Sequence, residues 1–203
     1  MYPTTISVAG DFGSGKDEVA RILVEDFGYT RFAFGDALKE EEQLVLNSAE
    51  YRDFVWDQMP LTARDAVLTC LALGYLDPFA KPTTPEMREL HQRYGTDFRR
   101  WCTHMEYWIQ RTEEKIGGCA RVVFSDLRFK DELKAVRRRK GLYWKVVRTG
   151  TIYAGYDPGL AAHISEHDLD GERPDSVIPN YGTLDDLRKL IHMDMRHLNL
   201  MAA

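Results

Sequence analysis

The feature that most constrains what this chain can fold into is a glycine-rich stretch close to its first residues. It runs Gly10-Asp11-Phe12-Gly13-Ser14-Gly15-Lys16-Asp17. Residues 5–9 before it are predicted to form a short buried strand, and residues 18–27 after it have apolar positions at helical spacing. Such glycines let main-chain N–H groups surround phosphate oxygens, and a lysine here can reach the outer phosphates. We therefore predict a P-loop that binds ATP; the alternative is a glycine-rich turn that only caps a helix.

Two carboxylates are candidates for holding Mg²⁺. Asp17 stands where a P-loop usually has Ser or Thr, and a carboxylate is also a hard oxygen ligand. Asp126 ends an apolar run, where P-loop proteins commonly place an acid that holds the metal or its waters. Each has a simpler interpretation as an acid at the start of a helix. We predict a magnesium site made by Asp17 and Asp126.

Strands that alternate with helices set the expected fold. Besides the first strand, we expect strands over 29–34, 121–126, 142–148 and 175–180. This order predicts an α/β protein with a five-stranded parallel sheet and helices on both of its faces, in three layers. With 203 residues and no separating linker, the chain is predicted to be a single domain, 1–203.

A long helical region, 36–118, interrupts the strand pattern. We expect a helix over 62–73 and another that starts near Pro85, capped by Thr83 or Thr84 and ended by a tight turn at Gly95-Thr96-Asp97. Arg88 and Gln92 are four residues apart and share a face of that helix. A guanidinium suits a phosphate and a carboxamide suits a base edge, although a solvated helix face would have the same pattern.

Ligands of parallel sheets collect at the carboxyl ends of the strands. The polar residues expected at those ends are Lys16, Asp36, Asp126, Arg128, Arg148 and Asn180. Arg128 would project to the same side as Asp126 if the strand continued that far, and could bind a phosphate or only pair with that acid. The last helix is predicted to be capped by Thr183, with Leu184, Leu187, Leu190 and Ile191 directed inward.

The charge is unevenly distributed. The chain has a net charge of −5, yet residues 126–148 contain nine Lys or Arg and three Asp or Glu, a local balance of +6. This pattern favours a small, multiply charged phosphate ligand over a long polyanion, so nucleic acid is not the expected partner. The run 137–140 is explained by cations at a helix C-terminus, with a nucleic-acid patch as the alternative.

Cysteine usage and hydropathy favour a protein of a reducing cytoplasm. The three cysteines are widely spaced, so neither a disulfide framework nor a zinc site is indicated. No apolar run is long enough to cross a membrane, and the first residues do not resemble an export signal. We expect a protein that is neither exported nor membrane-spanning; a homodimer is left open.

A glycine-rich segment, 149–168, has little periodicity and is longer than ordinary connections, so it is predicted to be a lid. His163, Ser165 and Glu166 within it lie too close together in sequence for a hydrolase triad, and no nucleophile-turn motif accompanies them.

Several motifs, in order, resemble those of the bacteriophage deoxynucleoside monophosphate kinases and, more distantly, of dephospho-CoA kinase. The motifs are Gly13-Ser14-Gly15-Lys16-Asp17, Phe34-Gly35-Asp36-Ala37-Leu38-Lys39, Arg88 with Gln92 and Gly95-Thr96-Asp97, Asp126 with Arg128-Phe129 and Glu132, His163 with Ser165-Glu166, and Asn180 with Gly182-Thr183. Asp after the P-loop lysine is common in that family, whereas Gly35 stands where Ala is frequent. The resemblance spans nearly the whole chain.

This resemblance implies a P-loop kinase fold that transfers the γ-phosphoryl group of ATP, with Mg²⁺, to a deoxynucleoside 5′-monophosphate in the cytoplasm, that of the host if the chain is phage-encoded. By the same resemblance, the catalytic residues would be Lys16, Asp126, Arg128 and Arg148; ATP would be bound by the P-loop and Asn180; and the acceptor would be bound by Asp36, Lys39, Arg88, Gln92, Gly95, Thr96, Arg128, Glu132, Ser165 and Glu166. The alternatives are a kinase acting on a hydroxymethylated base in DNA and a slow, nucleotide-gated binding protein.

Overall fold

The computed structural model describes residues 2–11, 13–148 and 163–201, and the chain forms two compact units. The sheet unit comprises Met1–Ala33, Glu113–Ala154 and Glu166–Ala203. The helical unit comprises Phe34–Thr112 and Gly155–Ser165, which includes most of the helical region expected from the sequence. Residues 149–162 of the predicted lid lie outside the described residues.

The sheet unit contains the predicted five-stranded parallel sheet. Its strands are β1 (Thr5–Ala9), β2 (Thr30–Phe32), β3 (Val122–Phe124), β4 (Leu142–Val147) and β5 (Ser176–Pro179). They are arranged in the order β2-β3-β1-β4-β5, and every neighbouring pair is parallel. The register pairs Ser7 with Phe124, Ala9 with Lys145, and Val147 with Pro179, so the carboxyl ends of these strands lie along one edge. The α/β prediction is confirmed.

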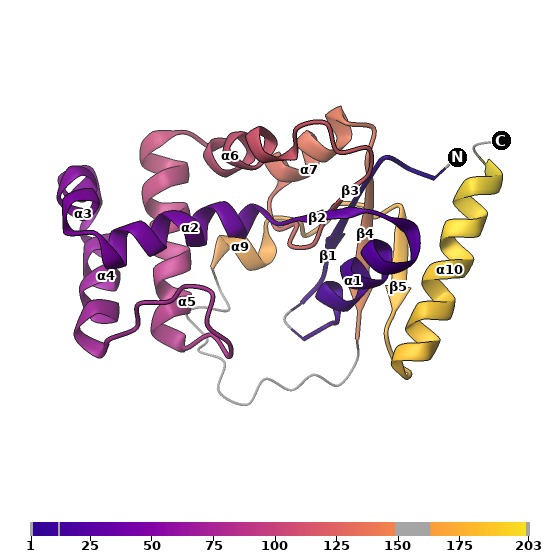
Figure 1. Cartoon of the computed structure of the whole chain (residues 1–203), viewed down its shortest axis with the longest axis horizontal. Coiled ribbons are helices and arrows are strands. Elements are labelled where there is room, and N and C mark those ends of the chain that lie inside the picture. The colour runs from indigo at the N-terminus through magenta and orange to yellow at the C-terminus, as the bar shows by residue number, and fades with distance from the viewer. Residues whose placement is uncertain (1, 12, 149–162, 202–203) are drawn as a thin grey trace. The chain divides into compact units, whose positions relative to one another are not determined.

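Helices cover both faces of this sheet (Figure 1). The helices α1 (Lys16–Phe27) and α10 (Leu184–Met201) pack together on one face, where their apolar side chains enclose Ile6 and Val8 of β1. The helix α7 (Lys130–Arg138) packs against β1 and β4 on the other face, the one to which Thr5 points. This alternation along β1 follows from the two-residue side-chain period of a strand. The helix α6 (Tyr107–Ile116) crosses the boundary between the units.

The end of α1 and the start of α10 have recognisable capping signals. Gly28 follows α1 with φ of 68°, a left-handed conformation that suits glycine. Thr183 caps α10, since its Oγ1 accepts from the Asp186 N–H at 3.2 Å while the Asp186 carboxylate accepts from the Thr183 N–H at 3.0 Å. Leu187 and Ile191 are buried as predicted, whereas Leu184 is 49% exposed and does not face the core.

The second strand is shorter than expected. It ends at Phe32, and the helix α2 (Phe34–Asn47) starts at Phe34, so Gly35 and Asp36 lie in the first turn of a helix rather than at a strand end. The reason is the helical period of the next buried positions, which are Phe34, Ala37, Glu41 and Val45.

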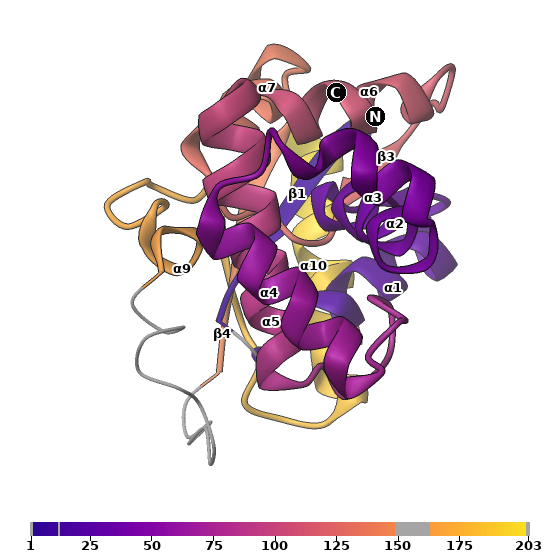
Figure 2. The ribbon, with the colours of Figure 1, turned by 90° about the vertical axis from the view of Figure 1, so that its left-hand side faces the viewer.

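The helical unit is built from α2 and the helices that pack with it (Figure 2): α3 (Ala49–Trp56), α4 (Leu61–Leu73), α5 (Pro85–Gln92) and the π-helix η1 (Arg93–Thr103). Of the two candidate caps of α5, the structure selects Thr84, whose Oγ1 accepts from the Met87 N–H at 3.2 Å. A short helix, α9 (Ile164–His167), follows the undescribed segment. No helix in the described part of the chain is long and apolar enough to cross a membrane.

The predicted turn at Gly95-Thr96-Asp97 is wrong, because the chain continues there as η1. Gly95 does not end the helix but allows close packing, because a Cβ at this position would lie only 2.9 Å from Cδ2 of Leu38. The Gly95 carbonyl also accepts a hydrogen bond from Trp108 Nε1 at 2.9 Å. The glycine therefore lets α2 approach η1 closely, a use of glycine that sequence spacing does not distinguish from a helix end.

Candidate active site

The glycine-rich stretch forms a loop between β1 and α1, as the P-loop prediction requires (Figure 1); Phe12 lies outside the described residues. Gly13 and Gly15 have φ of 73° and 96°, which few other residues adopt. Gly15 is the N-cap of α1 and supplies no side-chain acceptor, so the helix begins without a side-chain cap. The positive end of the α1 dipole and its first N–H groups are thus available to an anion.

Close packing fixes the course of this loop. A Cβ on Gly10 would lie 2.6 Å from the main-chain oxygen of Val146 and from Oγ of Ser14. The Ser14 N–H donates to the Asp11 carbonyl at 3.1 Å, and Nζ of Lys16 lies 3.4 Å from the same carbonyl oxygen. The hydroxyl of Ser14 is buried and finds no hydrogen-bond acceptor or donor among the described residues. The loop thus holds its shape through protein contacts before any nucleotide binds.

Asn180, predicted to bind ATP, makes a contact with the P-loop itself. Its Nδ2 donates to the Ser14 carbonyl at 2.8 Å, and its main-chain N–H donates to the Val147 carbonyl at 2.8 Å. The side chain is buried, and a Cβ on Gly15 would collide with its amide nitrogen. Asn180 therefore fixes the P-loop against the ends of β4 and β5.

Removing this amide should loosen the loop. We expect Asn180→Ala to weaken ATP binding about tenfold, since a hydrogen bond of this kind contributes roughly 1 kcal/mol and the buried Ser14 carbonyl loses its partner. Isothermal titration with ATP and Mg²⁺ measures the effect, and Asn199→Ala on the exposed face of α10 is the matched control. Equal affinities for the two variants would contradict a role for Asn180 in holding the loop.

The two predicted magnesium ligands belong to the same edge of the sheet unit. Asp17 is exposed in the first turn of α1, directly after the P-loop lysine, and Asp126 is half-buried two residues beyond the end of β3. No group of three or more His, Cys, Asp or Glu side chains in the described part of the chain could hold a metal by itself. Two carboxylates fit Mg²⁺ nonetheless, because this ion commonly uses one or two carboxylates together with waters and substrate phosphates.

Arg128 and Arg148 are cations near the same strand ends. Arg148 is exposed immediately after β4. Arg128 is half-buried in the connection between β3 and α7. Because β3 already ends at Phe124, strand alternation does not place Arg128 on the same side as Asp126. The main-chain N–H groups of Arg128 and Phe129 donate to the Glu132 carboxylate at 2.9 and 3.0 Å. Glu132, predicted to bind the acceptor, is buried and fixes the start of α7.

The other predicted acceptor residues lie in the helical unit. Asp36 and Lys39 are half-buried on α2, with Nζ of Lys39 5.5 Å from the centre of the Phe79 ring. Arg88 is half-buried on α5, and Gln92 is buried at its end. The remaining two, Gly95 and Thr96, are buried on η1, a helix type that is frequently found at functional sites. The structure thus places these residues on three elements of the helical unit, α2, α5 and η1.

The motif around His163 gains a structural context that sequence reasoning did not find. Nδ1 of His163 lies 2.9 Å from the Ser165 hydroxyl, and its Nε2 lies 4.0 Å from a carboxylate oxygen of Asp97 on η1. Arg93 also donates to Asp97 at 3.0 Å. The three residues 163, 165 and 97 therefore form a polar cluster within the helical unit, and the Glu166 side chain lies outside the described atoms.

A buried ion pair in the helical unit was also not predicted. The Glu41 carboxylate accepts from Nε of Arg99 at 2.5 Å, from the Tyr94 hydroxyl at 2.8 Å and from the Tyr107 hydroxyl at 2.8 Å. Glu41 and Arg99 are each about 5% exposed. The hydroxyl donors satisfy the carboxylate, which reduces the penalty of burying the charges.

The carboxylate of the neighbouring acid, Glu42, has fewer hydrogen-bond partners than that of Glu41. It is fully buried; one carboxylate oxygen lies 2.7 Å from Nδ1 of His91, and the other has no hydrogen-bond partner among the described residues. Burial raises the pKa of Glu42 above its usual value near 4.5, and the neighbouring His91 opposes that rise.

This raised pKa gives an expected pH dependence. The folded state holds the Glu42 proton more tightly than the unfolded state, so the free energy of unfolding should fall as the pH rises from about 4.5 through the folded pKa. Relative to wild type, Glu42→Gln should therefore become more stable as the pH rises across this window. Urea unfolding over a pH series measures it, with the exposed Glu50→Gln as the charge-matched control. Parallel profiles of wild type and Glu42→Gln would contradict this prediction.

Comparisons with known proteins give a fold and no family. No protein-family model matches the sequence, and no curated protein matches it. Among solved structures, a dephospho-CoA kinase from Campylobacter jejuni is 11% identical over 98% of this chain and 99% of that chain, with a TM-score of 0.50. TT1252 from Thermus thermophilus is 18% identical over 98% and 99% of the chains (TM-score 0.49), and a gluconokinase from Sinorhizobium meliloti 1021 is 15% identical over 100% and 99% (TM-score 0.47). At such identity, the likeness to the dephospho-CoA kinase establishes a shared fold alone.

Proposed function

We propose that this protein is an ATP-dependent kinase that phosphorylates deoxynucleoside 5′-monophosphates to the diphosphates. The observation that supports it most is the loop between β1 and α1. Its glycines adopt left-handed conformations, it leads into a helix without a side-chain cap, and Asn180 holds it in place. Such a loop binds the phosphates of a nucleoside triphosphate through main-chain N–H groups and the lysine. The fold shared with a dephospho-CoA kinase is consistent with this proposal.

On the donor side, the protein positions ATP and neutralises its charge. Lys16 would bind the outer phosphates, and the first N–H groups of α1 would bind the oxygens that face them. Asp17 and Asp126 would hold Mg²⁺, which supplies positive charge to the phosphate oxygens. Arg148, at the end of β4, would stabilise the charge on the migrating group. Phosphoryl transfer requires little other chemistry from the protein than this positioning.

On the acceptor side, the proposed binding residues are Arg88, Gln92, Asp36 and Arg128. The guanidinium groups of Arg88 and Arg128 would bind the acceptor phosphate, because a planar fork matches its oxygens. Gln92 and Asp36 would bind the base or sugar, since a carboxamide both donates and accepts hydrogen bonds. This assignment of a deoxynucleotide acceptor comes from the resemblance of the motifs to phage deoxynucleoside monophosphate kinases, and Ser165 and Glu166 are part of it.

A substrate screen tests the proposal. We expect ADP release from ATP and Mg²⁺ to be accelerated strongly by at least one deoxynucleoside monophosphate and not by dephospho-CoA or gluconate. In the Arg88→Ala variant, KM for that monophosphate should rise about tenfold or more while ATP binding is unchanged. Arg93→Ala, on the adjoining π-helix, is the control. ADP release that no monophosphate accelerates would refute the acceptor class and leave the P-loop assignment standing.

A further inference from the structure

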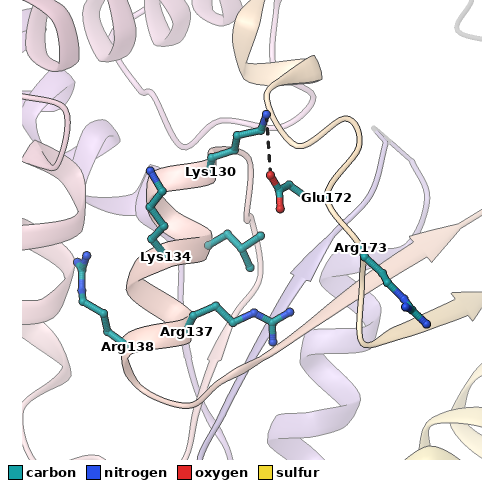
Figure 3. Close-up of a pocket in the computed structure, with 7 residues that line it drawn as sticks. Lys130, Lys134, Arg137, Arg138, Glu172 and Arg173 are labelled. Carbon is teal, nitrogen blue, oxygen red and sulfur yellow. Dashed lines mark ion pairs between the residues drawn. The ribbon is translucent and has the colours of Figure 1, made fainter.

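A groove lined by cations lies on the sheet unit, away from the P-loop in sequence. Its volume is about 550 Å³. It is lined by α7 and by the segment that precedes β5, through Lys130, Leu133, Lys134, Arg137, Arg138, Glu172 and Arg173. Figure 3 shows Lys134 and Arg138 projecting from one side of α7, while Lys130 and Arg137 project from the side that faces Glu172.

The charge of the side chains that line this groove is opposite in sign to the net charge of the chain. Five of its seven lining side chains are cations and one is a carboxylate, although the net charge of the chain is −5. A concave surface that concentrates one sign of charge attracts ligands of the other sign. The groove therefore suits an anion.

The helix dipole explains only part of this row of cations. Arg137 and Arg138 lie in the last turn of α7, where a macrodipole favours positive charge. Lys130 is the first residue of the same helix, where the dipole disfavours a cation, and Lys134 lies in the middle. The helix dipole therefore does not account for the presence of cations at all four positions, i, i+4, i+7 and i+8.

Carboxylates at the rim do not close the groove to an anion. Lys134 pairs with Asp131 at 3.3 Å, Arg137 with Asp175 at 2.6 Å, and Lys130 with Glu172 at 3.9 Å. These side chains are 40–72% exposed on the cation side. Arg137 also donates to the Gly141 carbonyl at 3.0 Å, and Asp175 also accepts from the Tyr143 N–H at 2.6 Å, so that pair is held in place. The exposed pairs of Lys130 and Lys134 contribute little stability, so phosphate oxygens can replace their carboxylates.

We propose that this groove binds the sugar–phosphate backbone of a nucleic-acid strand. From Lys130 to Arg138 the row extends about 12 Å along the helix axis. Successive phosphates of a strand are joined through a whole sugar unit and lie about twice the 3.4 Å axial rise apart, so about three of them match the row. A single phosphate would contact only one end of it. This inference is independent of the proposed kinase activity, and it differs from the expectation, drawn from the distribution of charge along the sequence, that nucleic acid is not a partner.

Strand binding is tested in the Lys16→Ala background, which weakens the P-loop as a competing phosphate site. Fluorescence anisotropy of a labelled 20-nucleotide single strand should show binding that weakens with salt, with a slope of log K against log salt of about −2 for three phosphate contacts. Affinity should rise with strand length until about three phosphates are present and rise only slightly beyond that.

The matched variants change two cations each. Lys134→Gln with Arg138→Gln should make the salt slope shallower by about 1.4 and weaken binding at low salt at least tenfold. Lys189→Gln with Arg196→Gln, on the exposed face of α10, removes the same charge from the same unit and should change neither value. Equal losses in the two double variants would overturn the proposal. So would competition by a free nucleoside triphosphate that matches the 20-nucleotide strand.

Discussion

Replacing Lys16 with Ala should lower kcat/KM for phosphoryl transfer about a thousandfold. Lys16 starts α1 directly after the P-loop, and in the proposed reaction its ammonium is the charge that binds the outer phosphates of ATP. Removing one preorganised group that stabilises developing charge typically lowers kcat by about 10²–10³, and loss of ATP affinity adds to that. A coupled ADP-release assay at varied ATP concentration measures both parameters.

The control for this variant is Lys189→Ala, which removes an exposed lysine from α10. It should retain wild-type activity. Circular dichroism spectra of both variants should match that of wild type, because Lys16 lies at the partly exposed start of α1 and outside the hydrophobic core of the sheet unit. Turnover that survives Lys16→Ala would refute the P-loop assignment, whereas turnover that is lost with monophosphate binding intact would support it.

Replacing Arg99 with Met should destabilise the helical unit by about 3–5 kcal/mol. The guanidinium is buried against Glu41, and its removal leaves a carboxylate in a site that water does not reach. The hydroxyls of Tyr94 and Tyr107 still donate to that carboxylate, but they cannot neutralise its charge. Because the chain has two units, unfolding of the helical unit is best followed by hydrogen exchange of the η1 amides, alongside urea denaturation.

Two further variants make this prediction specific. Arg93→Met removes another arginine of η1, whose pairs with Glu89 and Asp97 are partly exposed, and should change stability by about 1 kcal/mol or less. Adding Glu41→Gln to Arg99→Met should recover part of the loss, since no buried charge then remains unpaired. If Arg99→Met and Arg93→Met were equally mild, the buried pair would not stabilise the unit.

Local sequence signals predicted the sheet unit well. The run 5–9 is a fully buried strand, the glycines of the P-loop adopt the conformations that their spacing implies, and Thr183 caps the last helix. Each of these signals acts over a few residues, where period, turn chemistry and capping determine the backbone. The parallel direction of the strands also follows from alternation with helices, because parallel strands need crossover connections.

Features that depend on distant residues could not be predicted in this way. Glu41 and Arg99 are 58 positions apart, and their local sequences do not indicate that they form an ion pair. A glycine after a helical run commonly ends the helix, so the spacing predicts a turn at Gly95. In the structure, Leu38 occupies the space that a side chain at this position would need. The contact of Asn180 with the P-loop likewise depends on a distant residue, because its hydrogen bond reaches the carbonyl of Ser14, 166 positions away.

That hydrogen bond has a consequence for how the protein matures. The Ser14 carbonyl belongs to the first tenth of the chain, and the amide that fixes it comes 166 residues later. A polypeptide emerging from the ribosome therefore cannot complete its phosphate-binding loop until β5 has been synthesised and has joined β4. The protein should therefore gain its full affinity for nucleotide only late in its synthesis. Fragments that end before residue 180 should have a phosphate-binding loop that is not fully fixed.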